Sequence, residues 1–404
     1  MPGVKTVRLG TVAKMGSGGT PTSSIARYYG GSIPWVSISD MTSRGKYIRE
    51  TDRTLTDEGL AASSARLYEA DVVLYAMYAS LGECSLAVGR VSSSQAILGI
   101  SPGPKLDREY LYYYLQAMKP RVKLMGQQGT QANLNAGMVR AFEIPLPSLA
   151  EQSQIATALA DADRRIEVLG QLALKRESIA RGVMQQLLTG RTRLPGFTGE
   201  WHDAAVGELL TFKNGLNKAS EFFGAGTPIV NFMDVMNGPI INSTDVTGLV
   251  TLTKEERKRF EARRGDLFFT RTSETVDEVG TVAVLVDDIP DASFSGFILR
   301  GRPSSAVVDS VFLARAFQLD AVRDQVTSSA TYTTRALTNG RALGRIVISI
   351  PPVDEQRTIA AVISDFEAEI HALRSRLSKA RAVKTAMLQQ LMSRRAQLPV
   401  ETSL

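Results

Sequence analysis

The chain has 404 residues, of which 44% are hydrophobic and 22% are charged, the balance of a folded protein with two or three domains. It contains no run of eighteen apolar residues and no apolar signal core at its start, so we expect a cytoplasmic protein without a membrane span. One cysteine and two histidines exclude an intramolecular disulfide framework and a His/Cys metal site within one chain. The net charge of +6 favours an anionic partner only weakly.

Short segments rich in β-branched and aromatic residues lie between Gly, Ser and Pro clusters, which is typical of strands. The first half also predicts a helix over residues 108–125, and GGSIPWVSISDM at 30–41 resembles GAGTPIVNFMDV at 224–235. The expected strands are IPWVSIS, DVVLYAMY and CSLAVGRV in the first half and TPIVNFM, DLFFT, GTVAVLV and RIVISI in the second. Each half therefore predicts an α+β globular part.

A well-matched tail follows each globular part. Residues 144–195 align with residues 348–399 without a gap, at an offset of 204, with 16 identities in 52 positions. TQANLN at 130–135 and TRALTN at 334–339 share that offset. The chain is therefore two copies of one plan, with the sequence best matched in the tails.

Both tails predict long helices of roughly 38 residues, or about 57 Å at the rise of an α-helix. Steps of four and three residues form a heptad seam, and proline with an acidic residue marks each start. The seam residues are Ile359, Ile363, Phe366, Ile370, Leu373 and Leu377 in the second tail, and Ile155, Leu159, Ala162, Ile166 and Leu169 in the first, where Leu172, Ile179, Val183 and Leu187 continue an apolar face. A single apolar stripe needs a partner, so we expect the two helices to pair as an antiparallel coiled coil.

Motifs of common catalytic sites are absent. The sequence lacks GxxxxGK[ST] and GxSxG, and FFGAG at 222–226 has no Asn/Asp-Pro-Pro-Tyr/Phe partner of a methyltransferase. The acidic run VDDIPD at 286–291 is followed by no suitably spaced lysine, and Cys84 has no assigned base. We therefore expect a protein that is not an enzyme.

Two similar domains joined by paired helices suit a reader of duplex DNA, because a pseudo-twofold protein matches the twofold symmetry of the DNA backbones. Unequal copies would read two different half-sites. The sequence resembles the specificity subunit of type I restriction–modification systems over almost its full length. The resemblance rests on the segments GGTPTSSIARYYGGSIPWVSISDM, GTQANLN, IPLPSLAEQSQIA, QQLLTGRTRLPGF and IPPVDEQRTIAAVI.

This resemblance implies two target recognition domains, and helices that set a spacer and dock two modification subunits. It also implies restriction subunits as partners, and S-adenosylmethionine, ATP and Mg²⁺ bound by those partners and not by this chain. Adenine methylation would be the linked chemistry. The expected parts are recognition domain 1 at 1–146, a helix at 147–190, a linker and recognition domain 2 at 191–350, a helix at 351–393 and a tail at 394–404.

Hydroxyl groups and loop amides suit phosphates, Gln and Asn suit adenine edges, and Arg suits guanine. In the first domain these types predict contacts from Gly19, Thr20, Pro21, Ser37, Ser39, Tyr75, Tyr78, Gln128, Thr130, Gln131 and Asn133. In the second domain they predict contacts from Lys213, Asn214, Asn231, Arg271, Thr272, Ser273, Thr333 and Arg335. Residue types alone leave open that these are ordinary polar turns.

A second hypothesis remains open. The paired helices could make the chain a scaffold that brings two protein partners together, with its basic charge incidental. A scaffold predicts no sequence preference on DNA, whereas a DNA reader predicts binding that weakens steeply with salt.

Overall fold

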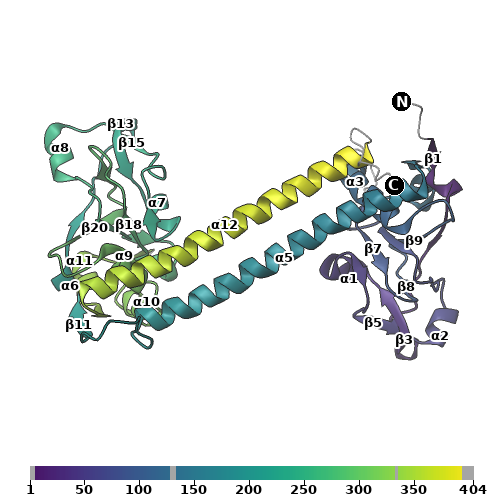
Figure 1. The fold of residues 1–404 in the computed structure, drawn as a ribbon, viewed down its shortest axis with the longest axis horizontal. Helices are drawn as coiled ribbons and strands as arrows, with labels where there is room; N and C mark the ends of the chain where they lie inside the picture. The colour runs from purple at the N-terminus through teal and green to yellow at the C-terminus, as the bar shows by residue number, and fades with distance from the viewer. Residues whose placement is uncertain (1–4, 128–132, 333–334, 394–404) are drawn as a thin grey trace, which may run out of the picture. The chain divides into compact units, whose positions relative to one another are not determined.

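The computed structural model describes residues 5–127, 133–332 and 335–393 and divides the chain into two compact units. Unit 1 consists of residues 1–171 with 374–404, and unit 2 of residues 172–373. Each unit holds one globular α+β part and a portion of both long helices (Figure 1). The predicted fold class is thereby confirmed, whereas the predicted domain boundaries stay a prediction.

The globular part of unit 1 is built on a five-stranded sheet and a three-stranded sheet. The first has the order β2-β9-β6-β7-β4 and the second β5-β3-β8, and β1 pairs with β10 in a small separate ladder. The strands are β1 (Thr6–Arg8), β2 (Ala13–Ser17), β3 (Tyr29–Val36), β4 (Tyr47–Ile48), β5 (Arg53–Leu55), β6 (Val73–Ala76), β7 (Cys84–Ala87), β8 (Ser92–Ser93), β9 (Ile97–Pro102) and β10 (Glu143–Pro145). The helices are α1 (Ile38–Arg44), α2 (Asp57–Ala61), α3 (Arg108–Gln127) and α4 (Ala136–Arg140).

Unit 2 repeats this topology. Its sheets have the orders β12-β20-β16-β18-β14 and β15-β13-β19, and β11 pairs with β23. The strands are β11 (His202–Ala205), β12 (Leu210–Asn214), β13 (Phe223–Val230), β14 (Ile240–Ile241), β15 (Leu249–Val250), β16 (Leu267–Thr270), β18 (Val282–Leu285), β19 (Ser293–Phe294), β20 (Ile298–Pro303) and β23 (Val347–Ile350). The helices are α6 (Val206–Leu209), α7 (Phe232–Met236), α8 (Lys254–Arg259), α9 (Ser310–Ala316), α10 (Asp320–Ser328) and α11 (Gly340–Gly344).

The two copies differ in two places. Helices α9 and α10 of unit 2 stand where unit 1 has the single helix α3. Unit 2 also has a three-stranded sheet of order β17-β22-β21, made of β17 (Thr272–Ser273), β21 (Thr331–Tyr332) and β22 (Ala336–Leu337). In the part of the chain that the structure describes, unit 1 shows no counterpart of this sheet.

The first predicted strand ends earlier than expected because a helix cap interrupts it. The segment IPWVSIS leaves the sheet at Val36, and α1 begins at Ile38. Ser37 caps this helix and exchanges side-chain and backbone hydrogen bonds with Asp40, in a capping box. Burial alone would raise the pKa of Asp40, but its hydrogen bonds with Ser37, with the Asp52 amide and with Arg44 lower it.

The two long helices are α5 (Leu149–Leu188) and α12 (Val353–Met392), each of 40 residues. In unit 1, Ile155 and Leu159 of α5 share a core with the end of α12 at Leu391 and Met392. In unit 2, the end of α5 at Leu187 and Leu188 shares a core with Ile359 and Ile363 at the start of α12. The start of each helix thus packs in the same core as the end of the other, which is the expected antiparallel pairing.

The second half of the α5 seam differs from the sequence prediction. Leu172 and Ile179 are each 39% exposed, while Ala173 and Ala180 are buried. A step of four from Leu169 reaches Ala173, and a further step of seven reaches Ala180, so the heptad continues through alanines. The expectation that Leu172 and Ile179 continue the buried face was wrong. It was based on their large apolar side chains, whereas the heptad spacing places Ala173 and Ala180 on the buried face.

Two fully buried glutamines attach the long helices to the globular parts. Gln152 of α5 and Gln356 of α12 occupy the same position in the two copies and have no exposed surface. In each, the amide oxygen accepts a hydrogen bond from a backbone N–H and the amide nitrogen donates to two carbonyl groups, at 2.7–3.0 Å. The partners are Asp107, Lys105 and Pro147 for Gln152, and Asp309, Val307 and Pro351 for Gln356. The three hydrogen bonds of each glutamine therefore satisfy backbone groups just before its own long helix and just before α3 or α9.

We expect Gln356→Leu to lower the free energy of unfolding by about 2–4 kcal/mol, because it leaves one buried N–H and two carbonyls without partners. Urea unfolding of the full chain would measure this loss. Gln171→Leu on the exposed face of α5 is the matched control and should change stability by less than about 0.5 kcal/mol. Equal unfolding midpoints for the two variants would contradict the proposed attachment.

Candidate nucleic-acid interface

One backbone hydrogen bond recurs at the same place in both copies. It joins the loop after the central strand of the five-stranded sheet to the segment before a short helix. The amide of Leu134 donates to Met77 in unit 1, and the amide of Thr338 donates to Arg271 in unit 2, each at 3.0 Å. Predicted contact residues from two distant segments meet here, because Tyr78 follows Met77 and Asn133 precedes Leu134.

In unit 2 this junction is extended by the sheet β17-β22-β21, in which Thr272 faces Leu337 and Ser273 faces Ala336. Beside the sheet lies a hollow of about 430 Å³, which we call the unit 2 hollow. Its lining residues are Phe232, Thr272, Ser273, Glu274, Thr275, Glu278, Phe297 and Arg335. Of these, the sequence predicted Thr272, Ser273 and Arg335.

The charged groups of this hollow are held loosely. A guanidinium nitrogen of Arg335 lies 3.9 Å from a carboxylate oxygen of Glu274, and the two side chains are 58% and 85% exposed. Such an exposed pair contributes little to stability, so the guanidinium is available to another partner. The buried hydroxyl of Ser273 donates a hydrogen bond to Glu278. Ser273 therefore positions a carboxylate and presents little surface of its own.

The remaining predicted residues of unit 2 lie on other elements. Lys213 and Asn214 end strand β12, where Asn214 is exposed and the Lys213 ammonium donates to the carbonyl of Arg259. Burial, and then the nearby charges of Arg300, Arg259 and Arg302, lower the pKa of Lys213. Positive charge is thus concentrated at this strand end.

Two further candidates in unit 2 have structural contacts. Asn231 caps helix α7 in a capping box with Asp234, whose carboxylate accepts from the Asn231 amide at 2.7 Å. Arg271 is half-buried, and its amide donates to the carbonyl of Phe297 at 3.1 Å. The candidate Thr333 lies outside the described residues.

The glycine-rich loop of unit 1 is packed into the fold. The carbonyl of Gly19 accepts from the Trp35 indole at 2.9 Å, and the carbonyl of Pro21 accepts from the Tyr29 hydroxyl at 2.7 Å. A Cβ on Gly19 would lie 2.2 Å from the amide nitrogen of Ala65. Gly19 and Pro21 are buried, and Thr20 between them is exposed, so the loop offers mainly Thr20 to a ligand.

Among the aromatic candidates of unit 1, only Tyr78 is on the surface. Its side chain is 38% exposed, and the next residue, Ala79, has a φ of +57°, a conformation that residues with side chains rarely adopt. Tyr75 has no exposed surface, and burial raises its pKa. The predicted contact by Tyr75 is therefore corrected: strand β6 is buried on both faces, and the Tyr75 ring packs against Phe142 in a core.

The other candidates of unit 1 are polar residues at helix starts and in one loop. Ser37 caps α1 and is half-buried, whereas Ser39 and Asn133 are exposed. Gln128, Thr130 and Gln131 lie outside the described residues. The polar cluster predicted at 128–133 is thus described only at its last residue.

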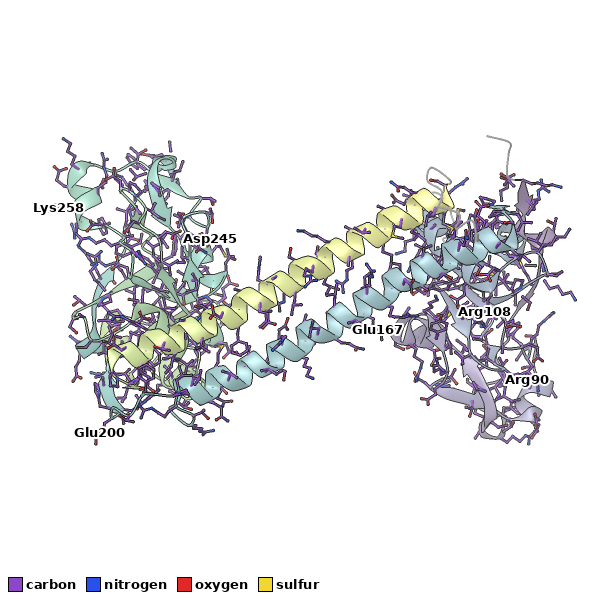
Figure 2. The ribbon with its side chains drawn as sticks, in the orientation of Figure 1. Arg90, Arg108, Glu167, Glu200, Asp245 and Lys258 are labelled. Carbon is purple, nitrogen blue, oxygen red and sulfur yellow. The ribbon has the colours of Figure 1, made fainter. Side chains whose placement is uncertain are left out.

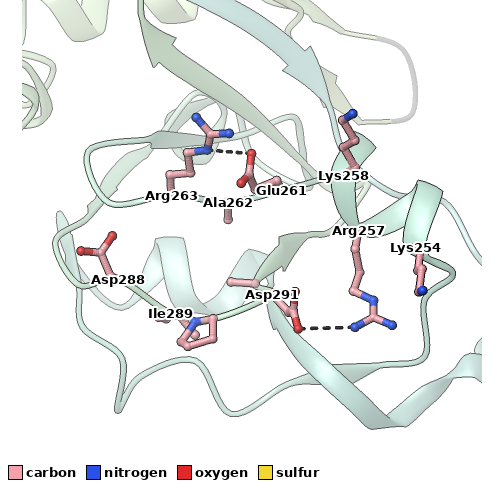
Figure 3. A pocket seen from close by; sticks show the side chains of 11 residues that line it. Lys254, Arg257, Lys258, Glu261, Ala262, Arg263, Asp288, Ile289 and Asp291 are labelled. Carbon is pink, nitrogen blue, oxygen red and sulfur yellow. Dashed lines mark hydrogen bonds and ion pairs between the residues drawn. The ribbon is translucent and has the colours of Figure 1, made fainter.

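Unit 2 has a basic surface that was not predicted from the sequence. Helix α8 and the segments facing it form a second hollow, of about 620 Å³, which we call the α8 surface (Figure 3). Arg257 pairs with Asp291 at 3.4 Å and Arg263 with Glu261 at 2.7 Å. Within the described part of the chain, no ion pair involves Lys254 or Lys258, and Lys258 lies at the outer edge of unit 2 in Figure 2.

The corresponding helix of unit 1 has the opposite charge. Helix α2 has the sequence DEGLA, with Asp57 and Glu58 in its first turn, whereas α8 has the sequence KEERKR. The run KEERKR was available in the sequence as a signal, but charged runs of this length are usually solvated surface. The position of α8 at the rim of a hollow distinguishes this run from ordinary solvated surface.

Residues 1–175 match the family model described as the type I restriction modification DNA specificity domain. The chain is also 24% identical over 288 residues to the MjaIX specificity subunit of a type I restriction enzyme from Methanocaldococcus jannaschii, and the match covers 66% of each chain. The chain is thus similar to the specificity subunits of type I restriction enzymes.

Other type I specificity subunits match over different lengths. The MjaVIII specificity subunit of the same organism is 20% identical, with 96% of this chain and 91% of the relative covered. The matches to the MjaIX and MjaX subunits cover less than two thirds of those relatives, 66% and 29% respectively.

Solved structures of type I specificity subunits share the fold. The S subunit from M. genitalium superposes with a TM-score of 0.56 at 15% identity, covering 96% of both chains. The HsdS subunit from Thermoanaerobacter tengcongensis gives 0.55 at 19% identity, covering 97% of both. At these identities the likeness concerns the fold alone.

Two further findings concern metal binding and membrane spans. No group of three or more His, Cys, Asp or Glu residues that could hold a metal ion occurs among residues 5–127, 133–332 and 335–393. Over the same ranges, none of the helices is both long enough and apolar enough to cross a bilayer.

Proposed function

We propose that this chain is the non-catalytic DNA sequence-recognition subunit of a type I restriction–modification complex, acting in the cytoplasm. It would read an asymmetric, bipartite site with its two globular parts, and direct adenine methylation and restriction by partner subunits to that site. The long helices would set the spacing between the two half-sites. The similarity to type I specificity subunits supports the role, and one observation within the chain supports the asymmetric reading.

That observation is the different chemistry at equivalent positions of the duplicated junction. The aligned segments TQANLN and TRALTN place Gln131 opposite Arg335, at the same offset that relates the two long helices. The recurring hydrogen bond places Tyr78 opposite Thr272. Glutamine suits adenine and arginine suits guanine. One backbone frame with different side chains would thus read two unlike half-sites.

The catalytic chemistry would belong to the partners. We propose two modification subunits that bind S-adenosylmethionine, and restriction subunits that bind ATP and Mg²⁺. The absence of GxxxxGK[ST] and of the methyltransferase motif from the sequence supports this division. The exposed polar residues at the junctions are hydrogen-bonding groups and supply no nucleophile with its base.

Co-expression of the chain with the neighbouring modification gene, followed by sequencing of methylated bases in the host genome, tests the proposal. We expect one interrupted motif with two unlike halves, because the two junctions differ. A stable complex without new methylation would instead favour the scaffold hypothesis.

Alanine at both Gln131 and Asn133 should weaken recognition of one half-site only, by about 1–3 kcal/mol for each lost base contact. The measurement is binding of the complex to duplexes in which one half-site at a time is replaced. Gln171→Ala, on the exposed face of α5, serves as the control. Equal loss at both half-sites would count against two independent readers.

Replacing Lys254 and Lys258 by glutamine should weaken DNA binding for all sequences alike and reduce the slope of log K against log salt by about 2, if each lysine neutralises one phosphate. Arginine at the same two positions keeps the charge and should keep the slope. Binding isotherms at several salt concentrations measure it. An unchanged slope in the glutamine variant would place the α8 surface away from DNA.

A further inference from the structure

The unit 2 hollow combines an exposed aromatic ring with a fixed backbone. Phe297 is 63% exposed, although its carbonyl accepts from the Arg271 amide at 3.1 Å and its amide donates to the Ser295 hydroxyl at 3.3 Å. The backbone that carries this ring is therefore held by hydrogen bonds, while the ring itself lies largely in water. Phe232 lines the same hollow as the first residue of α7, directly after the cap at Asn231. Two phenyl rings thus line one hollow together with polar and charged side chains.

The charges of the hollow do not suit a phosphate group. Two carboxylates, Glu274 and Glu278, line it together with a single guanidinium, that of Arg335. Carboxylates repel the DNA backbone, whereas base edges offer both donors and acceptors. The α8 surface of the same unit has four basic and three acidic side chains. Base edges therefore fit the unit 2 hollow, and phosphates fit the α8 surface.

The duplication shows which features are particular to unit 2. In unit 1, the amide of Met77 donates to the carbonyl of Ala96 at 2.9 Å, the same bond that Arg271 makes with Phe297. Alanine thus stands where unit 2 has the exposed phenyl ring, at a position held by the same backbone hydrogen bond. At this position the two copies differ in the side chain, as expected for a residue that determines specificity and does not maintain the fold.

We propose that the unit 2 hollow is a base-reading pocket in which Arg335 contacts the O6 and N7 edge of a guanine and Phe297 contacts the methyl group of a thymine in the adjacent base pair. Both groups lie in the major groove. The carboxylate of Glu274 keeps phosphates out of the pocket. This inference rests on the proposed function and adds Phe297 and Glu274 to the residues that determine specificity.

The test uses the complex of the full chain with its modification subunit and fluorescence anisotropy on labelled duplexes. The duplexes carry the methylated motif, or that motif with one base pair of the second half-site replaced. Arg335→Ala should reduce the preference for guanine at one position by about tenfold to a hundredfold. Preferences in the first half-site should not change. Arg357→Ala is the matched control, since Arg357 forms a similar surface pair with Asp354, with side chains 60% and 82% exposed.

A thymine-to-uracil exchange isolates the contact by Phe297, because uracil lacks only the methyl group. The unaltered complex should bind the uracil duplex severalfold more weakly at one position, and Phe297→Ala should remove that difference. Glu274→Gln should lower the guanine preference and raise the affinity for unrelated duplexes, because it removes a charge that repels phosphate. A variant that fails to fold would instead bind both the motif duplex and the unrelated duplexes more weakly.

The outcomes separate this inference from the proposed function. If the unaltered complex shows no sequence preference, the proposed function fails. If it reads its motif and Arg335→Ala reads it with the same preferences, the pocket assignment is overturned. If Arg335→Ala does not assemble, Arg335→Lys decides, because lysine keeps the charge but lacks the paired donors. A retained guanine preference in the lysine variant would overturn the assignment, and its loss would support it.

Discussion

Neither long helix can bury its apolar seam alone, and the rest of the structure depends on this constraint. A 40-residue helix with one apolar stripe exposes that stripe to water unless a second helix covers it. The duplication supplies the second helix within the same chain. Each compact unit accordingly includes part of α5 and part of α12, and one core cluster in each unit combines residues of the globular part with residues of both long helices. A change in the seam would therefore affect both units.

Interactions that satisfy the backbone are preserved between the copies, while interactions between side chains differ. Gln152 and Gln356 make the same three bonds. About three turns further along each helix, Asp163 and Glu367 occupy the same position in the two copies. Tyr113 and Lys384 contact Asp163, whereas the buried Arg315 contacts Glu367. Buried amide and carbonyl groups have a fixed geometry, so few side chains can replace a glutamine there. A carboxylate accepts many donors, so its partners can change.

The sequence predicted the elements that follow a period and missed the features that depend on a neighbour. Spacing alone located both long helices and the buried strand β6. It could not show that Tyr75 faces the core, because hydroxyl-bearing aromatic residues occur on either face of a strand. It could not show the exposure of Phe297 either, since exposure depends on which distant segments pack around a residue. The candidate site was therefore predicted by its segments and only partly by its residues.

A duplicated frame with variable side chains also accounts for the position of the candidate contacts. The residues that maintain the junction act through backbone atoms, as Leu134 with Met77 and Thr338 with Arg271 demonstrate. Because no side chain is needed for these bonds, the neighbouring side chains can change without loss of the frame. Selection can then alter what one junction contacts while the other stays as it was. A single chain with two such junctions would in this way change one half of the proposed bipartite site independently, which a symmetric homodimer could not do.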